Sequence, residues 1–243
     1  MAEPTDEVLL QHAIGNTPPS MYYFPNFITV EEEERILNKI PANKWISLSR
    51  RRLQAVPARL TASNTLVAST GLPDWLVKPV AERLDGLGVF KDAPHGTVNH
   101  CLINEYLPGQ GITPHEDGAT YHPVVATVSL GGSIVLDVTE KAALHRTDGA
   151  SDGRKAWRIL QEPCSLLVTT GSAYRDTLHG IADVEEDSVL NENTVANWSL
   201  LGDKEKLVAN GERNERTMRV SLTYRDVLKV SNIGSKIFGK PKS

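Results

Sequence analysis

The chain has 243 residues and a formal net charge of −4; 40% of its residues are hydrophobic and 23% are charged. This composition excludes a disordered or fibrous protein, and the length suffices for one domain with a substantial core. The acidic balance argues against a protein that wraps nucleic acid over its whole surface, since that mode of binding needs a strongly basic domain.

The beginning of the chain follows no regular pattern. Pro18 and Pro19 interrupt helix and strand alike, and the apolar residues before them lack a sustained period. We therefore predict a flexible leader at residues 1–20, with ordered structure starting at Met21.

A first helix is expected shortly after this point. Thr29 and Glu32 have the spacing of a capping box, in which each side chain bonds to the other residue's backbone at a helix start. The glutamates of the run EEEERILNKI complement the positive end of the helix dipole. Ile36, Leu37 and Ile40 recur at helical spacing, so this helix is predicted to pack one face on the core.

A second helix is predicted after the sequence Leu72-Pro73-Asp74. One side of it would carry Leu76, Val77, Val80 and Leu84, at the spacing of a buried face. Pro79 lies within the same run and lacks the backbone N–H that a helix interior needs. We therefore expect a kink or interruption there.

From Thr97 onward, short apolar runs are separated by Gly, Pro and Asp at intervals typical of a β-sandwich or jelly roll. Seven runs have the length and composition of strands: VNHCLINEYL, VATVSL, SIVLDV, AWRILQ, SLLVTT, DTLHGI and RVSLTYR. These suffice for two facing antiparallel sheets. The predicted fold class is α+β and mainly β, a jelly roll with N-terminal helices packed outside.

The polar stretches near 139–156, 182–197 and 202–217 are predicted to be surface insertions, because Asp, Glu, Asn and Gly replace the apolar periodicity. None of them has the composition of a domain linker, so we expect a single domain at 21–228. Residues 229–243 contain lysines but no acid, and they are predicted to form a flexible basic tail.

A candidate metal site begins at ITPHEDG. His115 and Asp117 are two positions apart, so an extended backbone projects both side chains to one face. His179, in TLHGI, lies on another predicted strand that a second sheet can bring alongside. Two imidazoles and one carboxylate form the facial triad of non-heme Fe(II) oxygenases, which leaves positions open for a bidentate cosubstrate and dioxygen.

The triad spacing has little specificity alone, since seven histidines in 243 residues generate such spacings by chance. A zinc protease motif is excluded, because no second histidine follows His115-Glu116 at the required distance. Zinc can still bind such a site opportunistically, since its intrinsic affinity exceeds that of iron.

The run RVSLTYR strengthens the case for the triad. Arg219, Ser221, Thr223 and Arg225 alternate onto one strand face, where buried guanidinium groups require anionic partners. A dicarboxylate such as 2-oxoglutarate would meet this need, with Arg219 gripping its far carboxylate and Arg225 its other anionic end. The alternative is that one or both arginines form structural ion pairs with acidic residues of a neighbouring strand.

A second pair of polar residues supports the cosubstrate interpretation. In CLINEYLPG, Asn104 and Tyr106 alternate onto one face just upstream of the first two candidate metal ligands. Both side chains can donate hydrogen bonds to a bound anion.

The chain resembles the AlkB family of Fe(II)- and 2-oxoglutarate-dependent dioxygenases, most closely its homolog-six branch. The resemblance lies in four motifs and in their order along the chain: NEY-LPG, PHEDG, LHGI and RVSLTYR. It covers residues 21–225. This resemblance implies a double-stranded β-helix, and that His115, Asp117 and His179 hold iron. It further implies that 2-oxoglutarate is bound by a larger set: Asn104, Tyr106, Arg219, Ser221 and Arg225. Ser221 departs from this pattern, since some family members place Asn between the two arginines.

The activity that the resemblance implies is oxidative N-demethylation of alkylated nucleobases in DNA or RNA, with dioxygen consumed and 2-oxoglutarate converted to succinate. A base inside a duplex cannot reach such an iron, so the nucleic-acid partner would be single-stranded or would flip its base. Two alternatives stay open. One is hydroxylation or demethylation of a protein side chain; the other is a non-catalytic module that binds 2-oxoglutarate or nucleic acid.

The resemblance puts the substrate lid within the segment 41–73, which contains lysine and arginine but no acid. Arg50, Arg51 and Arg52 would contact phosphates and Trp45 would stack on a base. A surface loop whose charges only aid solubility would show the same pattern.

Cys101 and Cys164 lie in apolar, strand-like surroundings and are expected to be buried free thiols. No apolar run is long enough to span a membrane, and the first residues lack the features of a signal peptide. We therefore expect a protein of the cytoplasm and nucleus. Its oligomeric state is open, with a monomer favoured.

Overall fold

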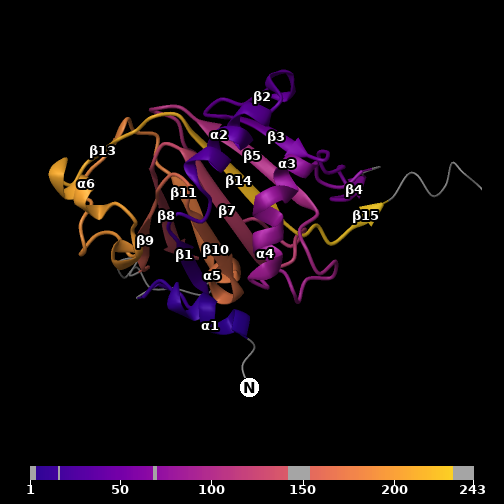
Figure 1. Cartoon of the computed structure of the whole chain (residues 1–243), viewed down its shortest axis with the longest axis horizontal. Helices are drawn as coiled ribbons and strands as arrows, with labels where there is room; N and C mark the ends of the chain where they lie inside the picture. Colours follow the sequence, from indigo (N-terminus) through magenta and orange to yellow (C-terminus); the bar gives the residue numbers. More distant parts are fainter. Residues whose placement is uncertain (1–3, 16, 68–69, 142–153, 232–243) are drawn as a thin grey trace, which may run out of the picture.

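The computed structural model describes residues 4–15, 17–67, 70–141 and 154–231, and consists mainly of two antiparallel sheets that lie face to face (Figure 1). The larger sheet contains, in order across the sheet, β1 (Met21–Phe24), β10 (Leu166–Thr170), β7 (Val124–Gly131), β14 (Arg219–Arg225), β5 (His100–Tyr106), β3 (Arg52–Val56) and β2 (Ile46–Ser47). The smaller sheet contains β6 (Ile112–His115), β11 (Thr177–Ile181), β8 (Ile134–Glu140) and β9 (Ala156–Gln161). The expected α+β class, mainly β, is confirmed.

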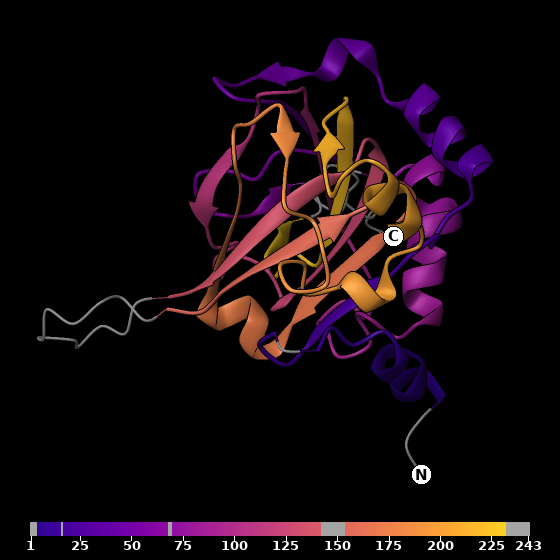
Figure 2. The same ribbon diagram turned by 90° about the vertical axis from the view of Figure 1, so that its left-hand side faces the viewer.

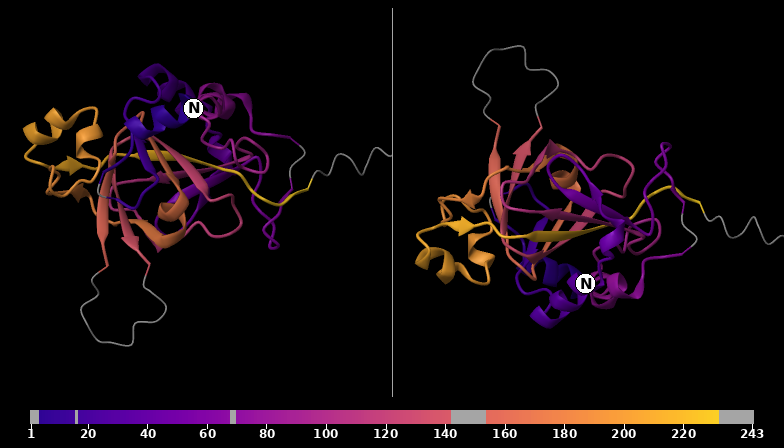
Figure 3. Two further views of the ribbon diagram at one scale, coloured as in Figure 1. Left: turned by 90° about the horizontal axis from the view of Figure 1, so that it is seen from below. Right: turned by 90° about the horizontal axis from the view of Figure 1, so that it is seen from above.

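Helices and short strand pairs surround these sheets. The helices are α1 (Pro4–Gln11), α2 (Val30–Lys39), α3 (Asp74–Leu76), α4 (Glu82–Gly86), α5 (Gly171–Asp176) and α6 (Lys204–Ala209), with single helical turns at Ala42–Lys44 and Trp198–Leu200 and a kinked segment at Val77–Ala81. Two short pairs join β12 (Glu186–Asp187) to β13 (Asn214–Glu215) and β4 (Leu66–Val67) to β15 (Val230–Ser231). The part of the chain with α6 and β13 lies at the opposite end of the molecule from β15 (Figure 3).

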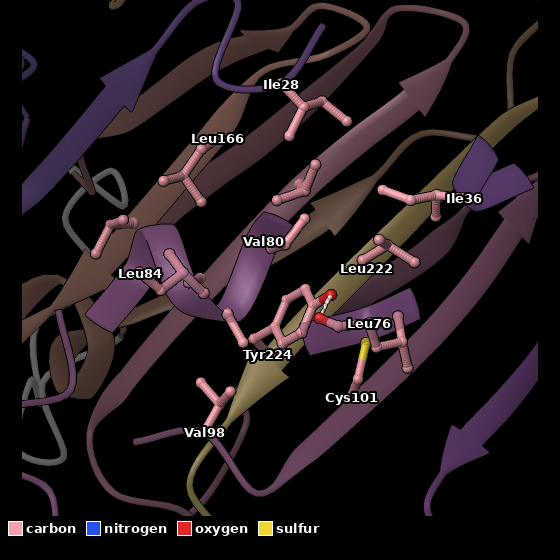
Figure 4. Packing of buried hydrophobic residues seen from close by; sticks show 14 of the residues in the cluster. Ile28, Ile36, Leu76, Val80, Leu84, Val98, Cys101, Leu166, Leu222 and Tyr224 are labelled. Carbon is pink, nitrogen blue, oxygen red and sulfur yellow. Dashed lines mark hydrogen bonds between the residues drawn. The ribbon is translucent and has the colours of Figure 1, made fainter. Parts of the chain in front are cut away.

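The main core lies between the larger sheet and helices α2, α3 and α4, which cover its outer face (Figure 2). Ile36 of α2, Leu76 of α3 and Leu84 of α4 are buried against Leu222 and Tyr224 of β14 (Figure 4). The Tyr224 hydroxyl donates a hydrogen bond of 2.8 Å to the Leu76 carbonyl, which ties α3 to the central strand. The outer face of β14 is therefore fixed by packing, and its inner face is left for polar side chains.

Both helix predictions are confirmed. At the start of α2, the Thr29 side chain accepts a hydrogen bond from the Glu32 backbone and the Glu32 carboxylate accepts one from the Thr29 backbone. The second helix is interrupted at Lys78, whose backbone (φ −102°, ψ 122°) is extended. Pro79 explains this break, because the proline ring clashes with a helical conformation of the residue before it.

The predicted absence of regular structure before Met21 is wrong. Helix α1 occupies Pro4–Gln11, and Ala13 forms an isolated antiparallel bridge with Tyr22 of β1. Leu9 packs against the main core, and Ile14 is buried. These tertiary contacts order a segment whose own sequence has weak helical periodicity.

All seven predicted strands are present, as β5, β7, β8, β9, β10, β11 and β14. Both cysteines are buried and free, as expected. The predicted basic tail beyond Ser231 and the centre of the polar stretch near 139–156 lie outside the described residues. Within the described ranges, no helix has the length and apolar character that crossing a membrane requires.

Candidate active site

The two strands β6 and β11 bring the three candidate metal ligands together. His115 and His179 are direct partners across the antiparallel pair, with ring centroids 4.4 Å apart, and Asp117 follows two residues after His115. The ligand atoms of these three side chains all lie within 4.8 Å of one another. His115 donates from Nδ1 to the Thr113 carbonyl at 2.9 Å, which leaves its Nε2 free to bind a metal.

Electrostatics favour the metal-binding forms of these residues. Burial lowers the pKa of His179 to about 4, while Asp117 opposes the shift, so the imidazole is neutral at pH 7. The Asp117 carboxylate forms an ion pair with Arg225, and both side chains are less than a tenth exposed. This pairing fixes the orientation of the Asp117 carboxylate.

The donor set fits iron(II). Two imidazoles and one carboxylate form the only cluster of metal-ligand side chains found among the described residues, and no fourth protein ligand joins them. Such a set binds one face of an octahedral metal and leaves three positions for other ligands.

A cavity of about 110 Å³ lies between the two sheets and includes the triad. The inner face of β14 forms one wall, through Arg219, Ser221, Thr223 and Arg225, as the alternation of RVSLTYR predicts. In the neighbouring strand β5, Tyr106 lies opposite Arg219 and Asn104 lies opposite Ser221, and both line the same cavity. The structure thus brings all the candidate cosubstrate residues to one wall.

Arg219 is a buried cation without an anionic partner among the described residues. It is 2% exposed, and it donates from Nε to Ser129 Oγ at 2.8 Å and from Nη2 to Gln161 Oε1 at 3.1 Å. Burial lowers its pKa to about 10, which still leaves it charged at pH 7. Since a desolvated charge requires pairing, this guanidinium fits a bound carboxylate. The sequence left open a structural ion pair for Arg219, for Arg225 or for both. Among the described residues, Arg225 forms such a pair and Arg219 does not.

Two polar residues that hold Arg219 in place were not identified from the sequence. Ser129 is fully buried on β7, and Gln161 ends β9 with 1% exposure. Each is a fully buried polar residue on a strand made mainly of apolar residues. That combination is the signal that could have identified them, because buried polar groups need hydrogen-bond partners.

The four residues proposed for substrate contact have different surroundings. Arg50 pairs with Asp183 at 2.7 Å on the surface. Arg52 forms two 2.6 Å contacts with Glu105 and covers the Trp45 ring at 4.6 Å. Arg51 donates to Asn104 Oδ1 at 3.1 Å, and it is the one of the four that lines the cavity.

The model of the 2OG-Fe(II) oxygenase superfamily matches residues 48–225, which contain the triad and both cosubstrate strands. The chain is a 2OG-Fe(II) oxygenase. Enzymes of this superfamily use Fe(II), 2-oxoglutarate and dioxygen, in agreement with the donor set and the unpaired guanidinium of the cavity.

Within the superfamily, the chain belongs to the AlkB family. It is 38% identical to a zebrafish (Danio rerio) protein named probable RNA/DNA demethylase ALKBH6, over 91% of this chain and 92% of that protein. A mouse (Mus musculus) tRNA (carboxymethyluridine(34)-5-O)-methyltransferase, ALKBH8, is 26% identical over 86% of this chain but only 31% of its own length. The solved structure of OsALKBH1 shares the fold, with 15% identity and a TM-score of 0.52 over 86% of this chain and 98% of that one.

Gly111 permits the close approach of β6 and β11 that this oxygenase site depends on. A Cβ at this position would collide with the Ile181 carbonyl oxygen and lie 3.0 Å from the Ala182 carbonyl. Gly111→Ala should therefore separate His115 from His179 and lower iron-dependent turnover about a hundredfold, as misplacement by about 1 Å can do. Gly86→Ala, outside the 41–73 segment and with no atom within 4 Å of the new Cβ, is the control. Equal metal affinity in both variants, measured by calorimetry, would contradict this account.

Proposed function

We propose that the chain demethylates N-alkylated nucleobases of DNA or RNA, using iron held by His115, Asp117 and His179. The oxidative chemistry in this proposal is supported by one observation: the metal triad shares its cavity with Arg219, a buried guanidinium with no carboxylate partner among the described residues. When bound, iron would supply activation of dioxygen, with 2-oxoglutarate as the two-electron reductant: one oxygen atom would go to succinate, with loss of carbon dioxide, and the other would hydroxylate a substrate C–H bond.

The residues of the chain have separate roles in this proposal. Arg219 holds the far carboxylate of 2-oxoglutarate, with Tyr106 beside it: the Arg219 Cζ atom is 5.7 Å from the centroid of the Tyr106 ring. Asn104 and Ser221 donate to the rest of the cosubstrate from adjacent strands. Arg225 orients the Asp117 carboxylate and contributes positive charge beside the second anionic end of the cosubstrate. These groups line the cavity between the two sheets.

The substrate class rests on the zebrafish relative, which is named for RNA/DNA demethylation and is matched over nearly its whole length. Hydroxylation of an N-methyl group gives a hemiaminal that releases formaldehyde and leaves the base unmodified. The target base must be single-stranded or flipped out of a duplex, since stacked bases cannot reach a metal between two sheets. The half-exposed side chains of Arg50 and Arg52, at the turn between β2 and β3 and at the start of β3, are suited to the phosphates of such a strand.

Turnover on methylated DNA and RNA oligonucleotides tests this proposal. We expect succinate and formaldehyde in equal amounts with at least one methylated oligonucleotide, and neither product with its unmethylated counterpart. A parallel panel of methylated and unmodified peptides covers the protein-substrate alternative. Product formation with peptides and none with nucleic acid would overturn the proposed substrate class while leaving the oxygenase chemistry intact.

A further inference from the structure

The cavity contains more positive than negative charge. Its charged side chains are Arg51, Arg219 and Arg225 against the single carboxylate of Asp117, with two histidines besides. Asp117 is paired with Arg225, and the proposed far-carboxylate contact uses Arg219. The third guanidinium of the cavity, that of Arg51, takes part in neither of these contacts. No carboxylate of the described residues pairs with it. Even with Fe(II) and the 2-oxoglutarate dianion added, the sum of these charges stays positive.

Arg51 reaches the cavity from a turn of the larger sheet. Strands β2 and β3 are joined by residues 48–51, where the Leu48 backbone N–H donates to the Arg51 carbonyl at 2.8 Å. The Arg50 side chain bonds to Asp183, just beyond the end of β11 in the smaller sheet. The turn is thus linked to both sheets, through Arg51 to Asn104 and through Arg50 to Asp183. The Arg50–Asp183 pair is half-exposed, and such pairs hold segments together only weakly.

The Arg51 contact also determines how Asn104 faces the cavity. Arg51 Nε donates to Asn104 Oδ1 at 3.1 Å, so the amide oxygen is engaged and the amide NH₂ is available as a donor. Asn104 is 6% exposed, which restricts its other orientations. The hydrogen bond therefore presents an N–H donor, rather than an oxygen, to an anion beside β5.

We propose that Arg51 is a positioning residue for the 2-oxoglutarate dianion, and that the anion in turn holds the 48–51 turn closed over the cavity. This inference rests on the proposed cosubstrate site and deepens it. The 48–51 turn then acts as a cap on the cavity. Its closure is coupled to cosubstrate binding through Asn104 and the charge of Arg51. Arg219 alone would give a site with no such coupling.

Backbone amide hydrogen exchange with Mn(II) in place of iron tests the coupling on the unaltered protein. At ten times its Kd, 2-oxoglutarate should slow exchange of amides in 46–53 about tenfold, because ligand that binds only the closed state suppresses opening by that factor. Amides in 204–215, at the far end of the molecule, are the internal control and should not change. Unchanged exchange in 46–53 with 2-oxoglutarate bound would overturn the cap.

Calorimetric titration with 2-oxoglutarate tests the role of Arg51 in cosubstrate binding. Arg51→Gln should weaken binding about tenfold, as loss of a charge-assisted interaction does, and should remove the protection of 46–53. Arg51→Lys should recover part of the affinity, since it retains the charge but loses the Nε donor that holds Asn104. Arg213→Gln, which removes an exposed arginine paired with Glu186 at 3.1 Å, is the matched control and should bind as wild type does.

The outcomes separate the two proposals. Wild-type protein that does not bind 2-oxoglutarate would refute the proposed cosubstrate site itself. Wild-type binding with equal affinity in Arg51→Gln would refute the role of Arg51 alone. Weakened binding in Arg51→Gln with an unaltered melting temperature, partly recovered in Arg51→Lys, supports positioning over a structural role.

Discussion

Replacing Arg219 with methionine should weaken 2-oxoglutarate binding about ten- to hundredfold without destabilising the ligand-free protein. Arg219 is a buried charge held by two neutral side chains, Ser129 and Gln161. Replacing a buried charge by an apolar residue of similar volume is often neutral, or stabilising by about 1–4 kcal/mol. The same change removes an interaction with carboxylate worth roughly 1.5–3 kcal/mol, or about ten- to hundredfold in affinity. Stability and function should thus move in different directions.

Thermal melting with and without 2-oxoglutarate measures both effects at once. Wild type should gain stability with the logarithm of ligand concentration above Kd, whereas Arg219→Met should melt at or above the wild-type temperature without ligand and gain much less from the same concentration. Arg219→Lys retains the charge without the bidentate fork and should show an intermediate response. If Arg219→Met loses several kcal/mol in the ligand-free state and still binds 2-oxoglutarate, Arg219 is a structural residue.

The unusual state of Arg219 was partly predictable. Alternation in RVSLTYR predicts a polar face and an apolar face, because successive strand residues point to opposite sides. The structure confirms both, with Val220, Leu222 and Tyr224 in the main core and the arginines in the cavity. Sequence could not tell which arginine lacks an acid. Asp117 is 108 residues from Arg225 along the chain, and only the meeting of the two sheets pairs them.

Local signals predicted other elements to different extents. The capping box at Thr29 and the break before Pro79 depend on neighbouring residues alone, so they could be predicted from sequence. Helix α1 could not, because its order comes from contacts with β1 and the core. The arginines at 50, 51 and 52 are identical and adjacent, yet their partners Asp183, Asn104 and Glu105 lie on distant segments.

Replacing Asp117 with alanine should abolish turnover and also destabilise the fold. The change removes one of three candidate metal ligands, and it leaves Arg225 buried without its counter-ion. Breaking a buried ion pair by removing one partner costs about 3–5 kcal/mol. His179→Ala removes a ligand of the same metal but no charge at pH 7, so it should lose metal binding with a smaller loss of stability. Denaturant unfolding of the metal-free proteins compares the two costs.

A double variant shows whether the destabilisation arises from the unpaired charge. Asp117→Ala combined with Arg225→Met removes both partners, so most of the lost stability should return while metal binding and turnover stay absent. Equal stability of the single and double variants would mean that the Arg225 charge is already compensated by solvent. In that case the ion pair would serve only to orient Asp117, and Arg225→Met alone would lower metal affinity, by about 10–100-fold, rather than stability.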